Sequence, residues 1–547
     1  MFNYAAAVAN VPQSEALSGQ VKNSAGGFSF PVDDWTRLER FLVLGSEGNT
    51  YYATAAVLTR ENSKSVERCI AVDGRRVVDL IVDVSDQGRA PKNDAALFAL
   101  AMAAKLGSPE TRAYALSVLS KVARIGTHLY HFASFINTLG GWGRGTKRAF
   151  ADWYLDMPED RLVYQAIKFQ QRDGWAHGDL LRLSHPKART ERQNIVFKWM
   201  VDGWEGVGPD PHSDPVLAQI WAFEKAKGCS EKELIRLISD YHLPHECVPN
   251  SSKGNPAVWD AMLPTMGIEA MIRNLGKMSK IGLLSPLSKA ESFVVSRLQD
   301  QESLAKSRLH PLHILVALNI YTRGHGEKGK LVWSPSLNVV DALDAAFYLA
   351  FKAVEPTNKR LMLALDVSGS MCNGEIAGMP GISPKVGSSA MALVTANVEP
   401  NHMFTAFTEG GAGAITFPGQ SSSYHCAISQ IAISPRQRLD DVCRFTDKLP
   451  FGGTDCALPM IWAAKNRIPV DTFVIYTDSE TWAGNVHPSR ALAEYRQKMG
   501  IAAKLVTVGM VSNGFTIADP GDAGQLDVVG FDTAAPALIS DFSRETS

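Results

Sequence analysis

Five side chains in the last third of the chain have the types and spacing to bind a divalent cation. They are Asp366, Ser368, Ser370, Thr454 and Asp478. All five are hard oxygen donors, and three of them are neutral hydroxyls. Such a set suits Mg²⁺, which prefers oxygen ligands and keeps some of its waters. Because the set carries little negative charge, a bound ion stays electropositive enough to accept an acidic group from a partner.

The segments before these residues predict how they are positioned. Apolar runs at 361–365 and 472–477 indicate buried strands that lead into Asp366 and Asp478, and a glycine pair precedes Thr454. A lone Asp-x-Ser-x-Ser is more often a solvated turn after a core strand, but five positions in this order favour a metal site. Ligands of open α/β sheets bind where the strand order reverses. If the two strands are neighbours there, their carboxylates converge on one ion.

The C-terminal region alternates strand-like and helical segments from about residue 357. We expect strands at 361–365, 402–407, 472–477 and 503–508, and helices at 388–396, 438–449, 457–465 and 488–499. This rhythm predicts a doubly wound α/β sheet. We therefore divide the chain into residues 1–356 and residues 357–547.

The region from about residue 85 to 355 is rich in Ala and Leu at helical spacing. One helix is expected to begin at Ser108-Pro109, where Ser can cap and Pro fits the first turn. Further helices are expected at 120–136, 160–172, 231–239, 259–275 and 311–321. Many short helices in series predict a solenoid of helical hairpins rather than a compact bundle.

A basic segment lies in this helical region. Residues 161–198 contain eight Lys or Arg and three acids in a chain whose net charge is −1. Lys168 and Arg172 are four positions apart and are expected to share a helix face. Trp175 could stack on an unpaired base, and His185, just before a proline, is biased towards a turn.

Two upstream groups extend the basic character. They are Lys121, Arg124 and His128 on the expected 120–136 helix, and Arg144, Lys147 and Arg148 in a glycine-containing segment. Phosphate contacts favour long cationic side chains on a firm scaffold, with aromatic rings nearby for bases. The alternative is that a charge run is a solvated helix face and that Trp175 belongs to the core, and from composition alone this is the more frequent case.

Composition narrows the class of protein. The chain has 547 residues, is 45% hydrophobic and 20% charged, and shows no global basic excess. Its seven cysteines are odd in number and include no CxxC pair, which argues against a disulfide framework and for a reducing compartment. There is no run of about 18 apolar residues and no basic leader before an apolar stretch. We expect a soluble cytoplasmic protein.

Several segments together resemble one family, in chain order. They are Phe41–Tyr52, Lys121–His128, Gly141–Gly145, Gly174–His177, Leu180–His185, Arg273–Met278, Arg308–His313, Gly452–Cys456, Val486–Pro488 and Ser512–Pro520. Up to Arg308–His313 these are similar to the TROVE domain of the Ro autoantigen ribonucleoproteins, of the bacterial type. The tail resembles a von Willebrand factor A domain with its metal-ion-dependent adhesion site. The first 30 or so residues match weakly.

The resemblance implies a ring of HEAT-like helical repeats closed by the A domain. It implies a noncatalytic, monomeric protein that binds small noncoding Y-type RNA on an outer basic surface. It also implies that single-stranded 3′ ends of misfolded or structured RNAs enter a central hole, for RNA quality control, processing or decay, with an exoribonuclease as a partner. By position, Lys168, Arg172 and His185 match family residues implicated in RNA binding, and the five metal-site residues match as well.

Two segments depart from the family pattern and two other functions stay open. The departures are a glycine-rich insert at 373–387 and the sequence His242–Cys247, whose two histidines and cysteine lack a fourth zinc ligand. One alternative function is a scaffold whose A domain docks an acidic protein partner through the metal. The other is a Mg²⁺-dependent hydrolase, which is disfavoured because both site carboxylates are needed by the metal and Glu480 stands alone.

Overall fold

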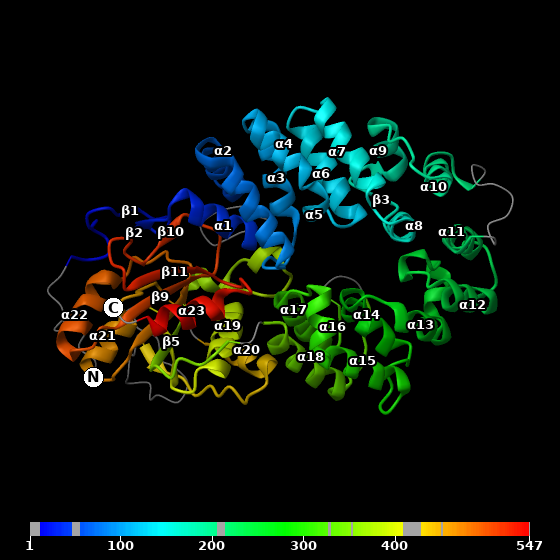
Figure 1. Ribbon diagram of the computed structural model, residues 1–547. Coiled ribbons are helices and arrows are strands. Elements are labelled where there is room, and N and C mark those ends of the chain that lie inside the picture. The colour runs from blue at the N-terminus through cyan, green and yellow to red at the C-terminus, as the bar shows by residue number, and fades with distance from the viewer. Residues whose placement is uncertain are drawn as a thin grey trace.

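The computed structural model describes residues 11–45, 55–204, 214–326, 330–351, 354–408, 428–449 and 452–545. Positions 46–52 of the first family segment and residues 1–10 therefore lie outside the described residues. A curved row of helices and an α/β domain make up the molecule (Figure 1). The row leaves the α/β domain at its first helix and returns to it at its last two, so the expected helical ring closed by an α/β domain is confirmed.

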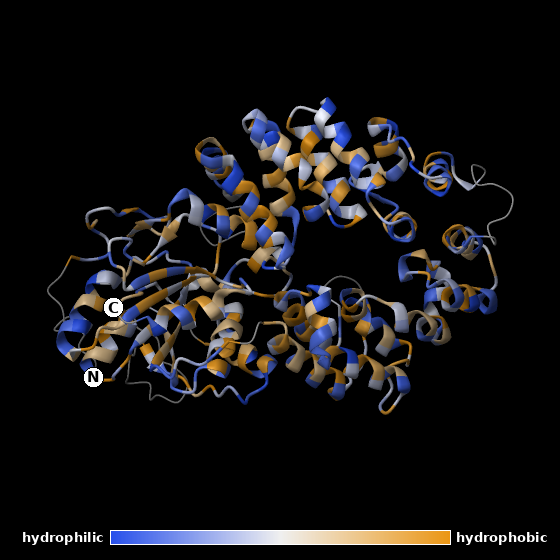
Figure 2. Ribbon diagram, in the orientation of Figure 1, coloured by the Kyte–Doolittle hydropathy of each residue, from blue (hydrophilic) through white to orange (hydrophobic). Residues whose placement is uncertain are grey.

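The row begins with α1 and ends with α18. Its helices are α1 (Asp34–Leu44), α2 (Ala55–Asp86), α3 (Asp94–Leu106), α4 (Pro109–Ser117), α5 (Leu119–Val122), α6 (Gly126–Thr138), α7 (Arg144–Leu155), α8 (Glu159–Lys168), α9 (His177–Ser184), α10 (Glu191–Asp202), α11 (Pro215–Ala226), α12 (Glu231–Tyr241), α13 (Pro256–Met262), α14 (Ile268–Lys280), α15 (Lys289–Gln299), α16 (Gln301–Ser307), α17 (Pro311–Arg323) and α18 (Leu337–Leu349). Neighbouring helices pack on one another along the row. Their apolar sides meet and their polar sides face outward, as Figure 2 shows.

The expected continuous helix at 120–136 is wrong, because the chain breaks between α5 and α6. Ala123 and Ile125 leave the helical conformation, and Trp153 Nε1 donates to the freed carbonyl of Ala123 at 2.6 Å. Gly126 then packs so closely that an added Cβ would lie 2.9 Å from Phe169 Cβ. Tertiary contacts from distant residues therefore outweigh the local helical pattern.

Two other expected helices are also shorter than their apolar periodicity indicated. The 160–172 helix is α8, which ends at Lys168, and the next residues form a two-stranded hairpin of β3 (Gln171–Arg172) and β4 (Trp175–Ala176). The 259–275 helix is divided into α13 and α14 by a short 3₁₀ turn that contains a proline. Proline lacks a backbone N–H and disrupts a helix interior, which accounts for the second break.

The α/β domain contains a six-stranded sheet with helices on both faces. Its elements are β5 (Leu361–Asp366), α19 (Pro384–Val398), β6 (His402–Phe407), β7 (Ile428–Gln430), α20 (Leu439–Asp447), α21 (Leu458–Lys465), β8 (Thr472–Thr477), α22 (Pro488–Met499), β9 (Lys504–Gly509), β10 (Phe515–Thr516), β11 (Gln525–Val529) and α23 (Ala535–Arg544). The strand order is β11-β9-β8-β5-β6-β7, and every pair is parallel except β6 with β7. The doubly wound prediction is confirmed.

Alternate residues of the central strands point to opposite faces of the sheet, as strand geometry requires. Leu363 and Leu365 of β5 join the core on the side of α19, whereas Met362 and Ala364 join the core beneath α21 and α22. All residues of β5, β8 and β9 are buried, and the first two strands are adjacent in the middle of the sheet. The order reverses between β5 and β8, and this is where the expected site residues follow their strands.

The N-terminal segment packs on the α/β domain rather than on the helical row. Strand β1 (Val21–Lys22) pairs with β2 (Phe28–Pro31), and β2 pairs with β10, so residues nearly 500 positions apart form one small sheet. Figure 1 shows β1 and β2 in blue beside β10. The sequence did not indicate these strands, because β1 and β10 have two residues each and β2 has four, which is too short for a readable alternation. No helix among the described residues is both long and apolar enough to cross a membrane.

Both ends of the helical row meet the α/β domain at one junction. His310, which caps α17, accepts from Leu312 N through Nδ1, so its Nε2–H can donate to the carbonyls of Arg89 and Phe531 at 3.1 and 2.9 Å. Burial lowers the pKa of His310 to about 3, so it is neutral here. One imidazole thereby joins the start of the row, its end and the α/β domain.

An ion pair at the same junction is largely withdrawn from solvent. The Arg89 guanidinium is 12% exposed and contacts Asp532, which is 2% exposed, at 2.6 Å. Arg89 also pairs with Glu39 and Asp83 from the helical row. Arg89 therefore pairs with carboxylates of both the α/β domain and the helical row.

Replacing Arg89 should strongly destabilise the closed ring. Arg89→Ala leaves the Asp532 carboxylate buried and unpaired, which costs about 3–5 kcal/mol. Thermal unfolding should show a clearly lower melting temperature for this variant. Arg68→Ala is the matched control, because its pair with Asp34 is exposed at 54% and 37% and such a pair contributes about 1 kcal/mol or less. Equal melting temperatures for the two variants would contradict the role given to Arg89.

Candidate metal and RNA-binding sites

The sheet brings the five candidate metal-site residues together at its carboxyl edge. Asp366 is the last residue of β5, and Asp478 follows β8, its parallel neighbour. Gly369 N donates to Gly452 O at 2.9 Å, which ties the first loop to the loop that carries Thr454. All five side chains are buried, at 5% exposure or less. The spacing in sequence is thus matched by convergence in space.

Hydrogen bonds preorganise the first loop. Asp366 Oδ1 accepts from Ser368 N at 2.9 Å, and Asp366 Oδ2 accepts from the Thr477 hydroxyl at 2.6 Å. The hydroxyls of Ser368 and Ser370 lie 3.1 Å apart, and Ser370 also hydrogen bonds the carboxylate of Asp478. The hydroxyl oxygens therefore lie close to both carboxylates, as ligands of a single ion must.

The electrostatics of the cluster favour a cation. Burial and the neighbouring charge of Asp478 raise the pKa of Asp366 to about 7, and burial raises the pKa of Asp478 as well. Two desolvated carboxylates in one site repel each other unless a positive charge lies between them. The donor set consists only of oxygens, which suits Mg²⁺. The residues present therefore fit a small divalent cation.

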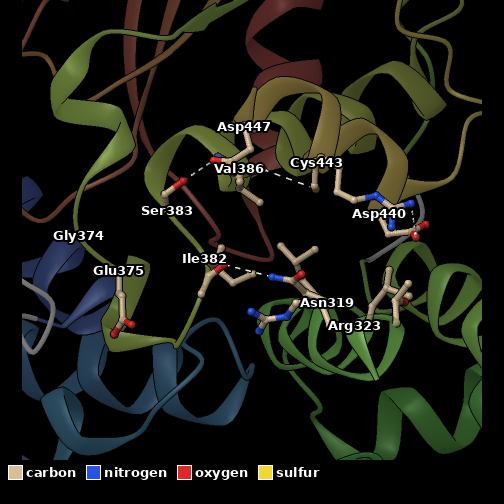
Figure 3. A pocket seen from close by; sticks show the side chains of 15 residues that line it. Asn319, Arg323, Gly374, Glu375, Ile382, Ser383, Val386, Asp440, Cys443 and Asp447 are labelled. Atoms are coloured by element: carbon tan, nitrogen blue, oxygen red, sulfur yellow. Dashed lines mark hydrogen bonds and ion pairs between the residues drawn. The ribbon is translucent and has the colours of Figure 1, made fainter. Parts of the chain in front are cut away.

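The insert after the first loop forms the wall of a cavity between the two parts of the molecule. The cavity, of about 480 Å³, is lined by α17, residues 374–383, α19 and α20 (Figure 3). Asn319 of α17 donates to the carbonyl of Gly381 at 3.1 Å, so the insert is attached to the end of the helical row. Arg323 and Cys443 line the same space from opposite sides. The insert thus connects the first metal loop to the row.

The departure at His242–Cys247 is not arranged as a zinc site. His242 ends α12 in the left-handed conformation, and the buried Cys247 thiol donates to the carbonyl of Ile167 at 3.3 Å. His245 Nδ1 lies 3.0 Å from Glu246. Among the described residues, no cluster of three or more His, Cys, Asp or Glu could hold a metal ion; the candidate metal site contains only two such residues.

The segment from the end of α8 through the β3–β4 hairpin carries the main candidate RNA-binding residues. Lys168 is the last residue of α8. Arg172 is the second residue of β3, and 62% of its side chain is exposed. The expected shared helix face is therefore wrong, although both side chains still lie on one short connection. Asp173 follows in the left-handed conformation and contacts His131 of α6 at 2.5 Å. That contact holds the hairpin against the row.

Trp175 is half-buried on β4 rather than sealed in the core. It is paired with Arg172 across the hairpin, and its ring centroid lies 5.7 Å from that of Trp142. Trp175, Arg182 and Asp179 line a surface hollow of about 550 Å³. An aromatic ring at the edge of an open hollow, beside the exposed side chain of Arg172, has the arrangement expected for base stacking.

The remaining candidate RNA-binding residues lie at different distances from the β3–β4 hairpin. Trp142 precedes α7, so Arg144 at the start of that helix lies near the hairpin, and Arg148 is exposed on the same helix. Lys147 is half-buried between them. His185 is exposed in the left-handed conformation at the end of α9, about 12 Å along the helix axis from its start.

The α5–α6 group is less suited to phosphate than its sequence indicated. Lys121 is exposed, but Arg124 is half-buried and donates to Ser85 at 2.6 Å. Burial and the charge of Arg124 lower the pKa of His128 to about 3. His128 is therefore neutral near pH 7 and offers no positive charge to a phosphate.

Sequence inspection missed an acid beside the candidate lysine. Glu246 lies 3.9 Å from Lys168 Nζ and also contacts His245. Its pKa is lowered despite burial, by the hydrogen bond from His245 and the charge of Lys168. The two residues are 78 positions apart, so no local pattern could have indicated the contact.

Family models match both parts of the chain. A TROVE domain matches residues 21–206 and 244–320, and a Ro60 vWA domain matches residues 360–543. The first part of the TROVE match contains α1 to α10 and the second part extends into α17, while α11 and α12 lie between the two parts. The second match begins immediately before β5.

Relatives extend the match to nearly the whole length. The chain is 42% identical over 539 residues to the RNA-binding protein RO60 of Deinococcus radiodurans, covering 98% of this chain and 97% of the relative. It is 32% identical over 600 residues to the RNA-binding protein RO60 of Caenorhabditis elegans, covering 96% and 90%.

A solved structure agrees in fold. The crystal structure of the Deinococcus radiodurans RO (RSR) protein aligns with a TM-score of 0.69 and 42% identity, over 94% of this chain and 99% of that one. Sequence, domain order and fold give the same result: the chain belongs to the Ro family, as a bacterial-type member with a TROVE domain followed by a Ro60 vWA domain.

Proposed function

We propose that this protein binds RNA without catalysing a reaction on it, as a monomer in the cytoplasm. In this proposal a small noncoding Y-type RNA occupies the outer basic surface of the helical row. Single-stranded 3′ ends of misfolded or structured RNAs enter the centre of the ring. The bound RNAs are then passed to quality control, processing or decay, with an exoribonuclease as a protein partner.

The observation that carries the proposal is the cluster of two cations and one aromatic ring at residues 168–175, in which Arg172 is 62% exposed and Lys168 and Trp175 are partly buried. Lys168, Arg172 and Trp175 lie on one connection, held by Asp173 against α6. A rigid backbone that presents cations to phosphates and a ring to a base is what single-stranded RNA binding needs. Two relatives that match over nearly their whole length are named RNA-binding proteins.

The metal site is proposed to bind Mg²⁺ through Asp366, Ser368, Ser370, Thr454 and Asp478. When bound, the ion supplies an electropositive centre that can accept a carboxylate. A second candidate function follows from this site: a scaffold whose α/β domain docks an acidic protein partner. It is favoured by the low negative charge of the donor set, which contains three hydroxyls and two carboxylates.

Electrophoretic titration separates the two functions. The probes are a hairpin RNA with a single-stranded 3′ tail and the same hairpin without a tail, each measured across a salt series. RNA binding predicts submicromolar affinity that falls steeply with salt, because cationic side chains release counterions from phosphates. Affinity for neither RNA at low salt would leave the docking scaffold as the function.

Glu246 should restrain RNA binding through its contact with Lys168. Glu246→Gln removes the opposing charge while keeping the size of the side chain. We expect the affinity for tailed RNA to rise by about two- to fivefold, in line with about 0.5–1 kcal/mol for a partly exposed pair. Glu302→Gln is the control, because its pair with Lys306 lies on the exposed face of α16. An equal rise in both variants would show only an effect of net charge.

A further inference from the structure

The first described residues lie against the loops of the candidate metal site. Residues 11–31 run over the α/β domain and end in β2, which pairs with β10. We name residues 12–31 the N-terminal segment. It is the part of the chain whose sequence resembled the family least, and neither candidate function uses it so far. Its contacts are concentrated on the residues that follow Asp478.

Gln13 is the central contact, and it is fully buried. Its Nε2 donates to Asp455 Oδ1 at 2.8 Å and to Val486 O at 2.7 Å. Its Oε1 accepts from the Thr481 hydroxyl and from Gly484 N. Both protons of the Gln13 side-chain amide and both acceptor positions of its oxygen therefore have hydrogen-bond partners. Because Asp455 adjoins Thr454 and Thr481 lies three residues after Asp478, one side chain ties two metal loops together.

Three further residues hold the loop after Asp478, two through its backbone carbonyls and one through the side-chain carboxylate of Glu480. Asn23 Nδ2 donates to the carbonyl of Thr481 at 2.7 Å, and the Ser29 hydroxyl donates to the carbonyl of Ser479 at 2.8 Å. The backbone N–H of Ser24 donates to Glu480 at 2.8 Å. Each of residues 479–481 thus has a partner in the N-terminal segment.

The held loop is strained and closely packed. Ser479 has φ of 63°, a conformation that non-glycine residues adopt only when their surroundings enforce it. Gly27 lies so near that an added Cβ would be 2.2 Å from the carbonyl of Thr481. The N-terminal segment is therefore in direct contact with the loop that it constrains, and it supplies the contacts that keep Ser479 in place.

We propose that the N-terminal segment is a clamp on the metal site, and that Gln13 is a positioning residue that sets its preference for a small cation. The proposal rests on the proposed Mg²⁺ site. Mg²⁺ demands near-octahedral geometry at 2.0–2.1 Å, whereas Ca²⁺ tolerates six to eight ligands in flexible geometry at 2.3–2.6 Å. Fixed loops therefore matter more to Mg²⁺ than to Ca²⁺.

The experiment is calorimetric titration of the full chain with Mg²⁺ and, separately, with Ca²⁺. For Gln13→Ala we expect the Mg²⁺ affinity to fall about tenfold or more, as for loss of a residue that orients metal ligands. The Ca²⁺ affinity should change by less than about threefold, so the ratio of the two affinities falls. Gln20→Ala is the matched control, because that amide contacts His487 at 3.2 Å and no metal loop. It should leave both affinities unchanged.

Each outcome decides the proposal. Equal losses for Mg²⁺ and Ca²⁺, or Mg²⁺ affinity equal to that of the wild type, would overturn the clamp while leaving the metal site standing. Absence of Mg²⁺ binding by the wild-type chain would overturn the site and the clamp together. A cooperative thermal unfolding transition reports folding of the variant. If Gln13→Ala does not fold, Asn23→Ala, which removes one bond to Thr481, is titrated in its place with the same expected direction.

Discussion

Removal of Lys168 and Arg172 together should lower the affinity for a tailed hairpin RNA by about 10- to 100-fold. Each side chain would lose a charge-assisted contact to phosphate, worth about 1 kcal/mol or somewhat more. The slope of log affinity against log salt should become shallower by about 1.5, since each single-strand phosphate contact contributes about 0.7. Electrophoretic titration of Lys168→Ala/Arg172→Ala at several salt concentrations measures both quantities.

The control for this variant changes the same number of charges elsewhere on the ring. Lys289→Ala/Lys306→Ala removes two exposed lysines from α15 and α16. Its affinity should stay within about twofold of the wild type, because long-range effects between exposed charges are screened. If the control variant lost as much RNA affinity as Lys168→Ala/Arg172→Ala, the RNA would be held by diffuse electrostatic attraction and not by a site at these residues.

Asp366→Asn should abolish stabilisation by Mg²⁺ without weakening the metal-free fold. Asparagine keeps the shape of the side chain and removes one of two buried charges that repel each other. In the wild type, an ion at a hundred times its dissociation constant adds about 2.7 kcal/mol to the free energy of unfolding. The variant should lose this gain, while its melting temperature without metal stays equal or rises.

Differential scanning calorimetry with Mg²⁺ and with a chelator measures this difference. Asp440→Asn serves as the comparison, because Asp440 is a buried carboxylate of α20 that pairs with Arg438 and lies outside the metal loops. That variant should keep the full gain from Mg²⁺. A gain from Mg²⁺ that survives Asp366→Asn would place the ion elsewhere.

RNA binding should be unchanged in Asp366→Asn. The candidate metal site is at the carboxyl edge of the central sheet, whereas the hairpin lies on the helical row between α8 and α9. Loss of both Mg²⁺ stabilisation and RNA binding in Asp366→Asn would indicate that the α/β domain and the helical row are coupled.

The metal site was predictable because its residues lie in short local patterns after strands. A buried strand that leads into a polar loop can be read from a window of about ten residues, and the α/β rhythm then places the loops at one edge. The strands at 402–407 and 472–477 and the helix at 488–499 have the expected bounds. Local signals dominate there because each element either belongs to one sheet or packs directly on one of its faces.

The features that could not be predicted depend on contacts between residues far apart in the sequence. The break at Ala123 exists because Trp153 and Gly126 have partners outside the helix. Neither Glu246 beside Lys168 nor Gln13 between the metal loops follows from periodicity, because each contact joins segments that are far apart in the sequence. Such contacts appear only once the topology is known.

We infer that RNA binds at residues 168–175 and along α9 to His185. Ultraviolet crosslinking of the wild-type protein to the tailed hairpin RNA, followed by mass spectrometry of the crosslinked peptides, tests it most directly. We expect crosslinks within residues 164–187, above all at Trp175. Crosslinks confined to the α/β domain, between residues 361 and 543, would contradict it.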